Sequence, residues 1–365
     1  MSTYLDSASG EPLHPAARAV LEQALEAGYA DPRRLHGAAR NARIMLDNAR
    51  SATAEALGVR PDEVTFTPSG THAVHLGVLG LLVGNARAGH RLLASAVEHA
   101  SVMHAGQWHH DHGGSFDTLP VDELGRVQAE GAAAATVLAV QSANHEVGTL
   151  QPVTGLAAHA PLFMDACASA GRLPLPEGWS AAAASAHKWG GPAGVGVLLV
   201  RKGSRWRNPF PGDDRVDERS TGMENVAGAL AAAAALQAVV AERDQVNPRQ
   251  HALIDRLRAG VAAIPDTEVV GDPVDRLPHL VTFSFLYVDG ESIVGELDRR
   301  GFAVASGSAC TASTLEPSHV LTAMGALTHG NLRVSLGRET TEADVDRLLA
   351  ALPEAVAKIR QDAGL

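Results

Sequence analysis

Cysteine and positive charge are scarce in this chain. Two cysteines, Cys167 and Cys310, stand far apart among 365 residues, which excludes the disulfide framework of a small secreted domain. The 41 Asp and Glu residues outnumber the 30 Lys and Arg residues, giving a formal net charge of −11 at pH 7. Neither nucleic acid nor an anionic membrane surface attracts such a protein, so we expect no nucleic-acid and no membrane partner.

Signals for export or membrane insertion are also lacking. The first residues, Met1 to Asp6, are not a basic stretch followed by an apolar one. The longest bland apolar run, residues 226–240, is rich in alanine, contains Gln237 and falls short of the roughly 20 residues that span a bilayer. With 45% hydrophobic and 19% charged residues, the chain does not have the composition of a disordered polymer. We therefore expect a soluble, globular, cytoplasmic protein.

Lysine is rare as well. The chain contains only Lys188, Lys202 and Lys358, so nearly all of its 30 basic residues are arginine. Arginine stays protonated in proteins, whereas a buried lysine can lose its proton. A reaction that needs a neutral amine therefore has few candidates.

Short apolar runs alternate with helical patterns over the first two thirds of the chain. The pattern predicts helices near residues 70–82 and 99–110, and strands near residues 63–67, 91–95, 136–141, 161–165, 181–185 and 194–200. Apolar strands that alternate with helices are typical of a largely parallel sheet covered on both faces. Such sheets bind ligands at the carboxyl ends of their strands.

The last third of the chain predicts a smaller α+β unit. A long helix near residues 226–243 leads to helices near 249–264 and 291–300 and to strands near 280–285 and 331–335. A final helix opens at Thr341, with Asp344 in the spacing of a capping box.

We therefore predict an α/β protein with two parts. A large domain at residues 13–240 has a mostly parallel sheet sandwiched by helices, and a smaller α+β domain comprises residues 1–12 and 241–365. Because ligand sites are common in clefts between such parts, we expect the site there.

The strongest local motif is Ser185-Ala-His187-Lys188, which ends an apolar strand and precedes a Gly-Gly-Pro turn. Burial lowers the pKa of a lysine amine, and pyridoxal phosphate (PLP) enzymes need such an amine to bind their cofactor. A lysine that only reaches from a strand end to water would give the same pattern. Asp165, which ends the preceding apolar strand, favours the first interpretation, because a carboxylate keeps the pyridine nitrogen of PLP protonated.

Two helix starts carry further candidates. Gly70 and Thr71 follow a polar turn where backbone N–H groups and a hydroxyl can hold a phosphate, although every helix start needs a cap. His99 follows the strand near residues 91–95, where an imidazole can stack on a flat cofactor or move protons. A lone histidine is also a common loop residue, so the pattern leaves both interpretations open.

Two candidates come from the last part of the chain. Cys310 lies in a run of small residues where a thiol can be exposed and reactive, although a free cysteine is more often a small buried hydrophobe, as we expect for Cys167. Arg333 lies on a short strand, where its guanidinium can bind a carboxylate through two hydrogen bonds or form a surface ion pair.

The histidine-rich segments predict no metal site. His109 and His112, like His72 and His75, have the spacing that places two ligands on one helix face. No further ligands accompany either pair, and solvated helix faces explain both.

Together and in this order, the motifs resemble the cysteine desulfurase family of PLP enzymes, within the class V aminotransferase group. The resemblance runs almost from end to end, and its most specific pieces are Ser185-Ala-His-Lys188, Ser306-Gly-Ser-Ala-Cys310-Thr, Leu315-Glu-Pro-Ser318 and Leu332-Arg333-Val-Ser-Leu-Gly337. It implies an enzyme that takes sulfur from L-cysteine or a related amino acid, leaving L-alanine and a persulfide on Cys310. It also implies a homodimer and a sulfur-acceptor or scaffold protein as partner.

The resemblance also implies roles for single residues. By similarity, Lys188 binds the cofactor and moves the proton at the substrate Cα, His99 stacks on the ring, and the Cys310 thiolate attacks the substrate sulfur. Arg333 and Asn144 match positions that bind the substrate. The residues that match cofactor-binding positions are Gly70, Thr71, His99, His145, Asp165 (at the pyridine nitrogen), Ser185, His187 and Lys188.

The chain departs from the family pattern around the cofactor. His145 stands in Asn144-His145-Glu146 where the family usually has Asn-Asn-Glu, so an imidazole is expected to face the ring hydroxyl. Ala168 replaces a glutamine, and Met223 replaces a threonine that reaches a phosphate across the dimer, with Thr221 nearby.

These departures keep two alternatives open. One is a PLP-dependent C–S lyase or selenocysteine lyase that acts on a modified cysteine. The other is a non-catalytic scaffold member of the family, against which the retention of Lys188, Asp165 and Arg333 argues, since a scaffold needs none of them.

Overall fold

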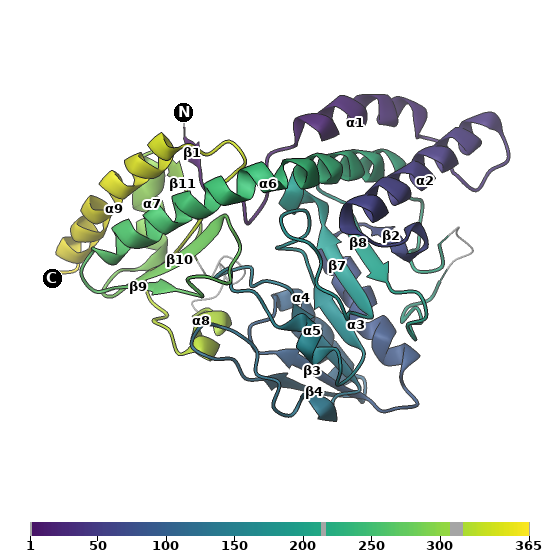
Figure 1. The fold of residues 1–365 in the computed structure, drawn as a ribbon, viewed down its shortest axis with the longest axis horizontal. Coiled ribbons are helices and arrows are strands. Elements are labelled where there is room, and N and C mark those ends of the chain that lie inside the picture. The colour runs from purple at the N-terminus through teal and green to yellow at the C-terminus, as the bar shows by residue number, and fades with distance from the viewer. Residues whose placement is uncertain (1, 213–216, 307–316, 365) are drawn as a thin grey trace.

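A computed structural model describes residues 2–212, 217–306 and 317–364 of the chain (Figure 1). Its main sheet has seven strands in the order β2-β8-β7-β6-β5-β3-β4. Only β8 runs antiparallel to its neighbours; the other adjacent pairs are parallel, which confirms the predicted fold class. The strands are β2 (Val64–Thr67), β3 (Arg91–Ser95), β4 (Ser115–Leu119), β5 (Val137–Gln141), β6 (Leu162–Asp165), β7 (Ala181–Ser185) and β8 (Gly196–Val200).

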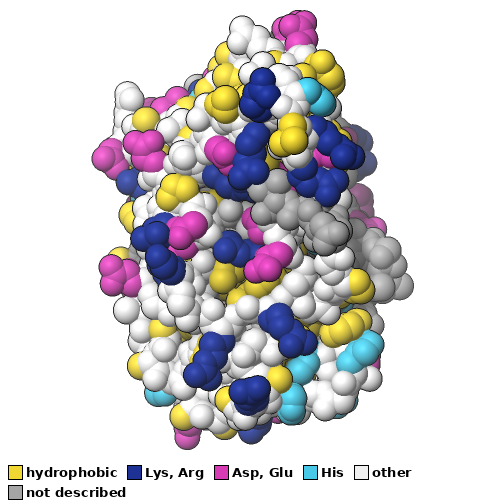
Figure 2. Space-filling view, turned by 90° about the vertical axis from the view of Figure 1, so that its right-hand side faces the viewer, with side chains coloured by type: hydrophobic (Ala, Val, Ile, Leu, Met, Phe, Trp, Pro, Cys, Tyr) yellow, Lys and Arg dark blue, Asp and Glu magenta, His cyan; other side chains and the backbone are white. Residues whose placement is uncertain are grey.

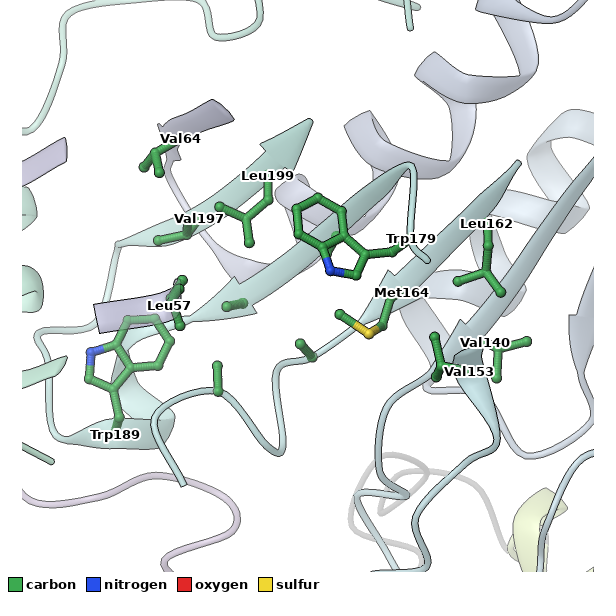
Figure 3. Close-up of a cluster of buried hydrophobic side chains, with 14 of the residues drawn as sticks. Leu57, Val64, Val140, Val153, Leu162, Met164, Trp179, Trp189, Val197 and Leu199 are labelled. Atoms are coloured by element: carbon green, nitrogen blue, oxygen red, sulfur yellow. The ribbon is translucent and has the colours of Figure 1, made fainter. Parts of the chain in front are cut away.

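The central strands are apolar throughout because both faces of the sheet are covered. Successive side chains alternate between two buried clusters: Leu162 and Met164 join one cluster, whereas Phe163 between them joins the other. Figure 3 shows part of the first cluster, where Val64, Leu199 and Trp179 also lie. The second cluster contains α3 (Gly70–Gly84) and part of α4 (Ala100–Asp111).

Gly77 explains how closely α3 approaches the sheet. A Cβ atom at this position would lie 2.3 Å from Cε2 of the Phe163 ring, which is fully buried. Only a residue without a side chain lets the helix sit so near the strand. The N-terminus of α3 is thereby fixed at the carboxyl edge of the sheet.

Two helices in the N-terminal region have no counterpart in the sequence prediction. These are α1 (Pro15–Ala27) and α2 (Gly37–Leu57), which form a hairpin along the upper right of Figure 1. Their N-caps are His14 and His36, whose side chains accept hydrogen bonds from Ala16 N–H and Ala39 N–H. Because histidine is not one of the usual capping residues, the start of each helix carries no typical sequence signal.

The prediction of two helices between residues 226 and 264 was wrong. The structure has a single helix, α6 (Val226–Ala262), which continues through Pro248. Proline removes a backbone donor and disfavours helix before it, which is why the sequence predicted a break. Packing overrides this preference, because Leu236 is buried against the main sheet and Leu257 against the smaller sheet.

By length and composition α6 could cross a membrane. It packs instead against α1, α2 and the C-terminal helix α9 (Glu342–Asp362), and half of its most apolar window is buried inside the protein. The helix is therefore part of the protein core and joins the two sides of the molecule, as Figure 1 shows.

The smaller side contains a three-stranded antiparallel sheet in the order β12-β10-β9. Thr341 and Asp344 form the predicted capping box at the start of α9. The bounds of the elements here are β9 (Thr267–Val270), β10 (Leu280–Phe285), β12 (Asn331–Ser335), the pair β1 (Thr3–Tyr4) and β11 (Phe302–Ala303), α7 (Gly290–Arg299) and α8 (His319–Met324). Three short elements of the larger side, α5 (Val153–Leu156), η1 (Pro61–Glu63) and η2 (Ala132–Ala134), lie in its loops.

Leu5, near the N-terminus, belongs to the buried cluster of this smaller side, together with Phe283 and Leu348. That contact supports placing residues 1–12 with residues 241–365, and the exact domain limits stay a prediction. A separate apolar cluster, which includes Val97, Val147 and Val320, packs the two sides together beside the site described next.

Candidate active site

A pocket of about 250 Å³ lies at the carboxyl ends of the strands of the main sheet. Each wall segment follows a different strand: β2, β3, β5, β6 and β7. This edge of a parallel sheet is where such folds bind ligands. The lining residues are Gly70, Thr71, Val74, His99, Ser101, Gln141, Ala143, His145, Asp165, Cys167, Ala168, Ser185, His187 and Lys188.

All eight residues predicted to contact the cofactor line this one pocket. Sequence reasoning missed five other lining residues: Val74, Ser101, Gln141, Ala143 and Cys167. Cys167 could have been found, because it stands two residues after Asp165, directly beyond a strand end. The roles of all these residues stay predictions.

Lys188 is presented by the short 3₁₀ helix η3 (Ala186–Trp189), which begins where β7 ends. Its Nζ atom donates a hydrogen bond to the carbonyl oxygen of Ala8. Gly190 ends η3 with a positive φ of 78°, and a Cβ there would lie 3.1 Å from Pro12 O. The Gly-Gly-Pro turn therefore serves to fold the chain sharply back after the lysine.

Asp165 lies at the end of β6 and is buried at the floor of the pocket. Its Oδ1 atom accepts a hydrogen bond from Cys167 N–H at 2.9 Å. Burial raises the pKa of the Cys167 thiol well above its usual value, Asp165 raises it further, and Lys188 opposes the shift. Cys167 is thus a protonated thiol beside Asp165. Because it is only partly buried and lines the pocket, the prediction that it is a buried hydrophobic residue was wrong.

The N-terminus of α3 opens into the pocket with two unused donors. The side chain of the N-cap Ser69 accepts the N–H of His72 at 3.0 Å, and within the described residues the N–H groups of Gly70 and Thr71 have no acceptor. A Cβ on Gly70 would lie 2.7 Å from Cβ of Ser185, so the glycine keeps this corner open. The helix end and its free N–H groups make a site for an anion.

Hydroxyl and imidazole groups complete this corner. Ser185 Oγ lies 3.1 Å from Nδ1 of His187, and both side chains line the pocket. The pKa of His187 is lowered by burial and, less strongly, by the charge of Lys188.

His99 is the N-cap of α4. Its Nδ1 atom accepts the N–H of Ser101 at 3.1 Å and lies 2.8 Å from the Ser101 hydroxyl. An Nδ1 that accepts a backbone N–H carries no proton, so the ring is neutral with its proton on Nε2. The rings of His99 and His145 meet edge to face, with centroids 5.0 Å apart and planes at 74°.

Asn144 does not line the pocket. Its side chain is fully buried, its Oδ1 accepts the N–H groups of Glu146 and Val147, and its Nδ2 donates to Val97 O. The structure thus gives Asn144 the task of shaping the turn that carries His145, and the predicted contact with substrate gains no support from this geometry.

Arg333 does not line the pocket and is 5% exposed. Its Nη1 donates to the carbonyl oxygen of His145 at 3.1 Å, and its Nη2 donates to Asp6 and Ser9. Its buried Nε has no acceptor among the described residues. A guanidinium with a free buried donor can still take a ligand oxygen.

The other residues singled out from the sequence either lie away from the pocket or fall outside the described residues. Cys310 lies outside the described residues, and Met223 is exposed and does not line the pocket. His109 Nε2 lies 2.9 Å from the carbonyl oxygen of His90, an ordinary helix-to-loop contact. Across the described ranges, no cluster of three or more His, Cys, Asp or Glu side chains is placed to hold a metal ion.

Comparison with known proteins agrees with this geometry. The family described as Aminotransferase class-V matches residues 3–348. The "IscS-like cysteine desulfurase" of Mycobacterium tuberculosis is 37% identical over 385 residues, covering 99% of this chain and 98% of that protein. The "Cysteine desulfurase IscS" of Methanosarcina thermophila is 32% identical over 375 residues, covering 98% of this chain and 93% of that protein.

A solved structure described as "NIFS-LIKE PROTEIN" has the same fold, with a TM-score of 0.90 and 25% identity. The match covers 98% of this chain and 100% of that one. The order of the motifs, the pocket and these relatives agree, and the chain belongs to the cysteine desulfurases of the class V aminotransferase family.

Proposed function

We propose that this protein is a PLP-dependent cysteine desulfurase. In the net reaction, L-cysteine and the Cys310 thiol give L-alanine and a Cys310 persulfide, so one sulfur atom moves from carbon to sulfur and no external oxidant is needed. The persulfide then passes its outer sulfur to an acceptor or scaffold protein. One observation carries the proposal: Lys188, Asp165 and the open N-terminus of α3 converge on a single pocket.

The residues present fit PLP. The N–H groups of Gly70 and Thr71, which have no acceptor in the part of the chain that the structure describes, form a corner for the phosphate with Ser185 and His187. Asp165 supplies the carboxylate that the pyridine nitrogen needs, and Lys188 supplies the amine. When bound, PLP provides an electron sink that stabilises negative charge at the substrate Cα.

The side chains of the chain itself bind substrate and move protons. Lys188 Nζ, now held by Ala8 O, takes and returns the proton at the substrate Cα. His99 is neutral and carries its proton on Nε2, so it can pack on a flat ring and donate from its edge. The Nε of Arg333 has no acceptor among the residues that the structure describes, which supports the proposal that its guanidinium binds the substrate carboxylate.

A second candidate is a PLP-dependent C–S or selenocysteine lyase that acts on a modified cysteine. It is favoured by one observation: His145 and Ala168, two departures from the family pattern, both line the pocket. In that case the reaction would not need the Cys310 thiol.

Product analysis separates the two candidates. Protein incubated with L-cysteine should yield alanine and sulfur in equal amounts, and the Cys310→Ser variant should yield neither while still binding PLP. Pyruvate with ammonia would contradict desulfuration, and so would full turnover by the Cys310→Ser variant.

We also propose a cytoplasmic homodimer that joins through the α1–α2 hairpin. The hairpin and its surroundings expose the apolar side chains Leu25, Tyr29, Leu35 and Ile44, and Leu35 is 89% exposed. Figure 2, which views the molecule from this side, shows hydrophobic side chains interspersed with Lys and Arg. A Leu35→Asp variant should sediment as a monomer, and an unchanged dimer would exclude this face.

A further inference from the structure

His145 places both of its ring nitrogens against oxygen acceptors. Nδ1 lies 3.4 Å from Oε1 of Gln141, and Nε2 lies 3.6 Å from Oε1 of Glu146. The amide of Gln141 cannot be turned around, because its Nε2 donates to Val97 O at 2.6 Å. A neutral imidazole has only one N–H, so only the doubly protonated ring has a proton to place toward each acceptor.

Glu146 supplies the charge that balances such a ring. Its side chain is only 5% exposed, and its Oε2 accepts a hydrogen bond from Ser318 Oγ at 2.6 Å. Burial acts to raise the pKa of Glu146, but the contact with His145, followed by that with Ser318, lowers it below the usual value. A buried carboxylate that stays ionised needs a cationic partner, and the imidazole of His145 is placed to be that partner.

We infer that Glu146, itself held by Ser318, keeps His145 as an imidazolium in the pocket wall, where it supplies a fixed positive charge for an anionic oxygen of the ligand. His145 would contact the ligand, and Glu146 and Ser318 act through it as positioning residues. The inference rests on the proposed function only for the identity of that ligand, the phenolic oxygen of PLP. An imidazolium stabilises the ionised form of this oxygen more strongly than the neutral amide expected from the family pattern.

Among the described residues, the other titratable groups around His145 are compatible with this charge. They come from several elements: His99 of α4, Glu98 before it, Asp165 of β6, Cys167 after it, His187 and Lys188 of η3, Arg333 of β12 and His319 of α8. Of these, His99 is neutral because its Nδ1 accepts a backbone N–H, and burial raises the pKa of Glu98 well above its usual value, which favours the neutral form of that carboxyl.

The remaining groups add both signs of charge. Lys188 disfavours a second cation in the pocket and Asp165 favours one. Arg333 reaches only the backbone of His145 and is paired with Asp6. The Nε2 of His319 lies 2.8 Å from Glu98 O, so that ring nitrogen is engaged away from Glu146. Within the described part of the chain, Glu146 is the carboxylate that contacts the ring of His145.

The direct test is nitrogen NMR of the histidine rings in protein freed of PLP, with His145→Asn used to assign the signal. We expect His145 to carry protons on both nitrogens at neutral pH and to titrate at least one unit above the ordinary value of about 6.5. In Glu146→Gln its midpoint should fall to that value or below. The inference would be overturned if the His145 ring of the wild type carried only one proton, or if its titration midpoint were the same in Glu146→Gln as in the wild type.

Glu98→Gln is the matched control, because it alters a neighbouring buried carboxyl that does not touch His145 and keeps an acceptor for Gln141 N–H. It should leave the His145 midpoint unchanged, and an equal shift in this control would also overturn the inference. Since these measurements use protein without PLP, they test the protonation of His145 and its dependence on Glu146 even if the protein proves not to be a desulfurase.

A second readout concerns bound PLP rather than turnover. The pH midpoint of the absorbance change of the bound cofactor should rise by about one pH unit in both His145→Asn and Glu146→Gln. Unchanged midpoints in both variants would contradict the placement of His145 beside the phenolic oxygen.

Discussion

Arg333 donates from Nη2 to Oδ1 of Asp6 at 3.0 Å, although 327 positions separate the two residues in the sequence. The contact fastens the N-terminal segment to β12 and fixes one side of the guanidinium, while Nε remains without an acceptor among the described residues. The side chain is therefore oriented before substrate arrives, which reduces the entropy lost on binding.

Replacing Arg333 should weaken substrate binding more than it slows the chemical step. We expect Arg333→Lys to raise KM for L-cysteine by at least about tenfold with a smaller change in kcat, because lysine keeps the charge but loses the planar pair of donors. Steady-state kinetics check this, and unchanged saturation behaviour would remove the role assigned to Arg333. Lys202→Arg, a basic substitution on the surface, serves as the control.

Asn144→Ala should cost stability rather than substrate affinity alone. The change leaves the N–H groups of Glu146 and Val147 without their present acceptor, whereas the carbonyl of Val97 keeps the hydrogen bond from Gln141 Nε2. Each buried group left unpaired costs about 1–3 kcal/mol, so we expect the loss of two partners to lower the free energy of unfolding by at least about 2 kcal/mol. Urea denaturation of protein without cofactor measures it.

Asn208→Ala is the control for this substitution, since Asn208 makes similar backbone contacts at an exposed site. Asn208→Ala should lower the free energy of unfolding far less than Asn144→Ala does. If Asn144→Ala were as stable as wild type but bound substrate poorly, the residue would be a substrate ligand, as the family resemblance implies.

Glu98 should make the protein less stable as pH rises. Its pKa is raised well above the usual value, first by burial and then by Asp165, against the opposing hydrogen bond from Gln141 N–H. The folded state holds this proton more tightly than the unfolded state. The stabilisation is therefore complete below the unfolded pKa and is lost, by at most about 1.4 kcal/mol per pH unit, as pH rises toward the folded pKa.

A glutamine at position 98 cannot ionise, so the free energy of unfolding of Glu98→Gln should not fall in this way as the pH rises. The variant should gain stability relative to wild type in urea unfolding measured across neutral pH, with the difference growing as pH rises. Parallel stability curves for the two proteins would show that Glu98 does not hold its proton in the folded state.

Alanine substitutions at two helical glycines should have opposite effects on stability. A Cβ on Gly77 of α3 meets the buried ring of Phe163, whereas a Cβ on Gly295 of α7 meets only the end of Arg299 at 3.8 Å. Gly77→Ala should destabilise the protein by about 1–3 kcal/mol through overpacking. Gly295→Ala should stabilise it by up to about 1 kcal/mol, because alanine favours helix. Thermal unfolding compares them, and equal effects would contradict the close packing of α3 on the sheet.

The sequence predicted six of the seven strands of the main sheet, because most of them are buried and read as apolar runs. It missed the edge strand β4, which is mostly exposed and carries Ser115, Asp117 and Thr118. Strands such as β5 and β6 begin and end within a residue or so of their predicted limits. Lys188, Asp165, His99, Gly70 and Thr71 could be singled out for the same reason, since each lies near the end of a strand that meets the same edge of the sheet. His145, Ser185 and His187 were named only because they match the family pattern.

The limits of several helices and the loop conformations around the pocket could not be predicted, because they depend on tertiary contacts. The helices α1 and α2 start at histidine caps, and α6 passes through Pro248 because both of its halves are buried. The contact between His145 and Glu146, and the placement of Cys167 in the pocket, likewise depend on how the loops after β5 and β6 fold.

The central claim is that the amine of Lys188 binds PLP, and the scarcity of lysine makes it directly testable. Protein loaded with PLP is reduced with borohydride, digested and examined by mass spectrometry. The account predicts one reduced cofactor on the peptide that contains Lys188, and none on the peptides of Lys202 or Lys358. A protein that retains no cofactor after reduction, or retains it on either of the other two lysines, would contradict it.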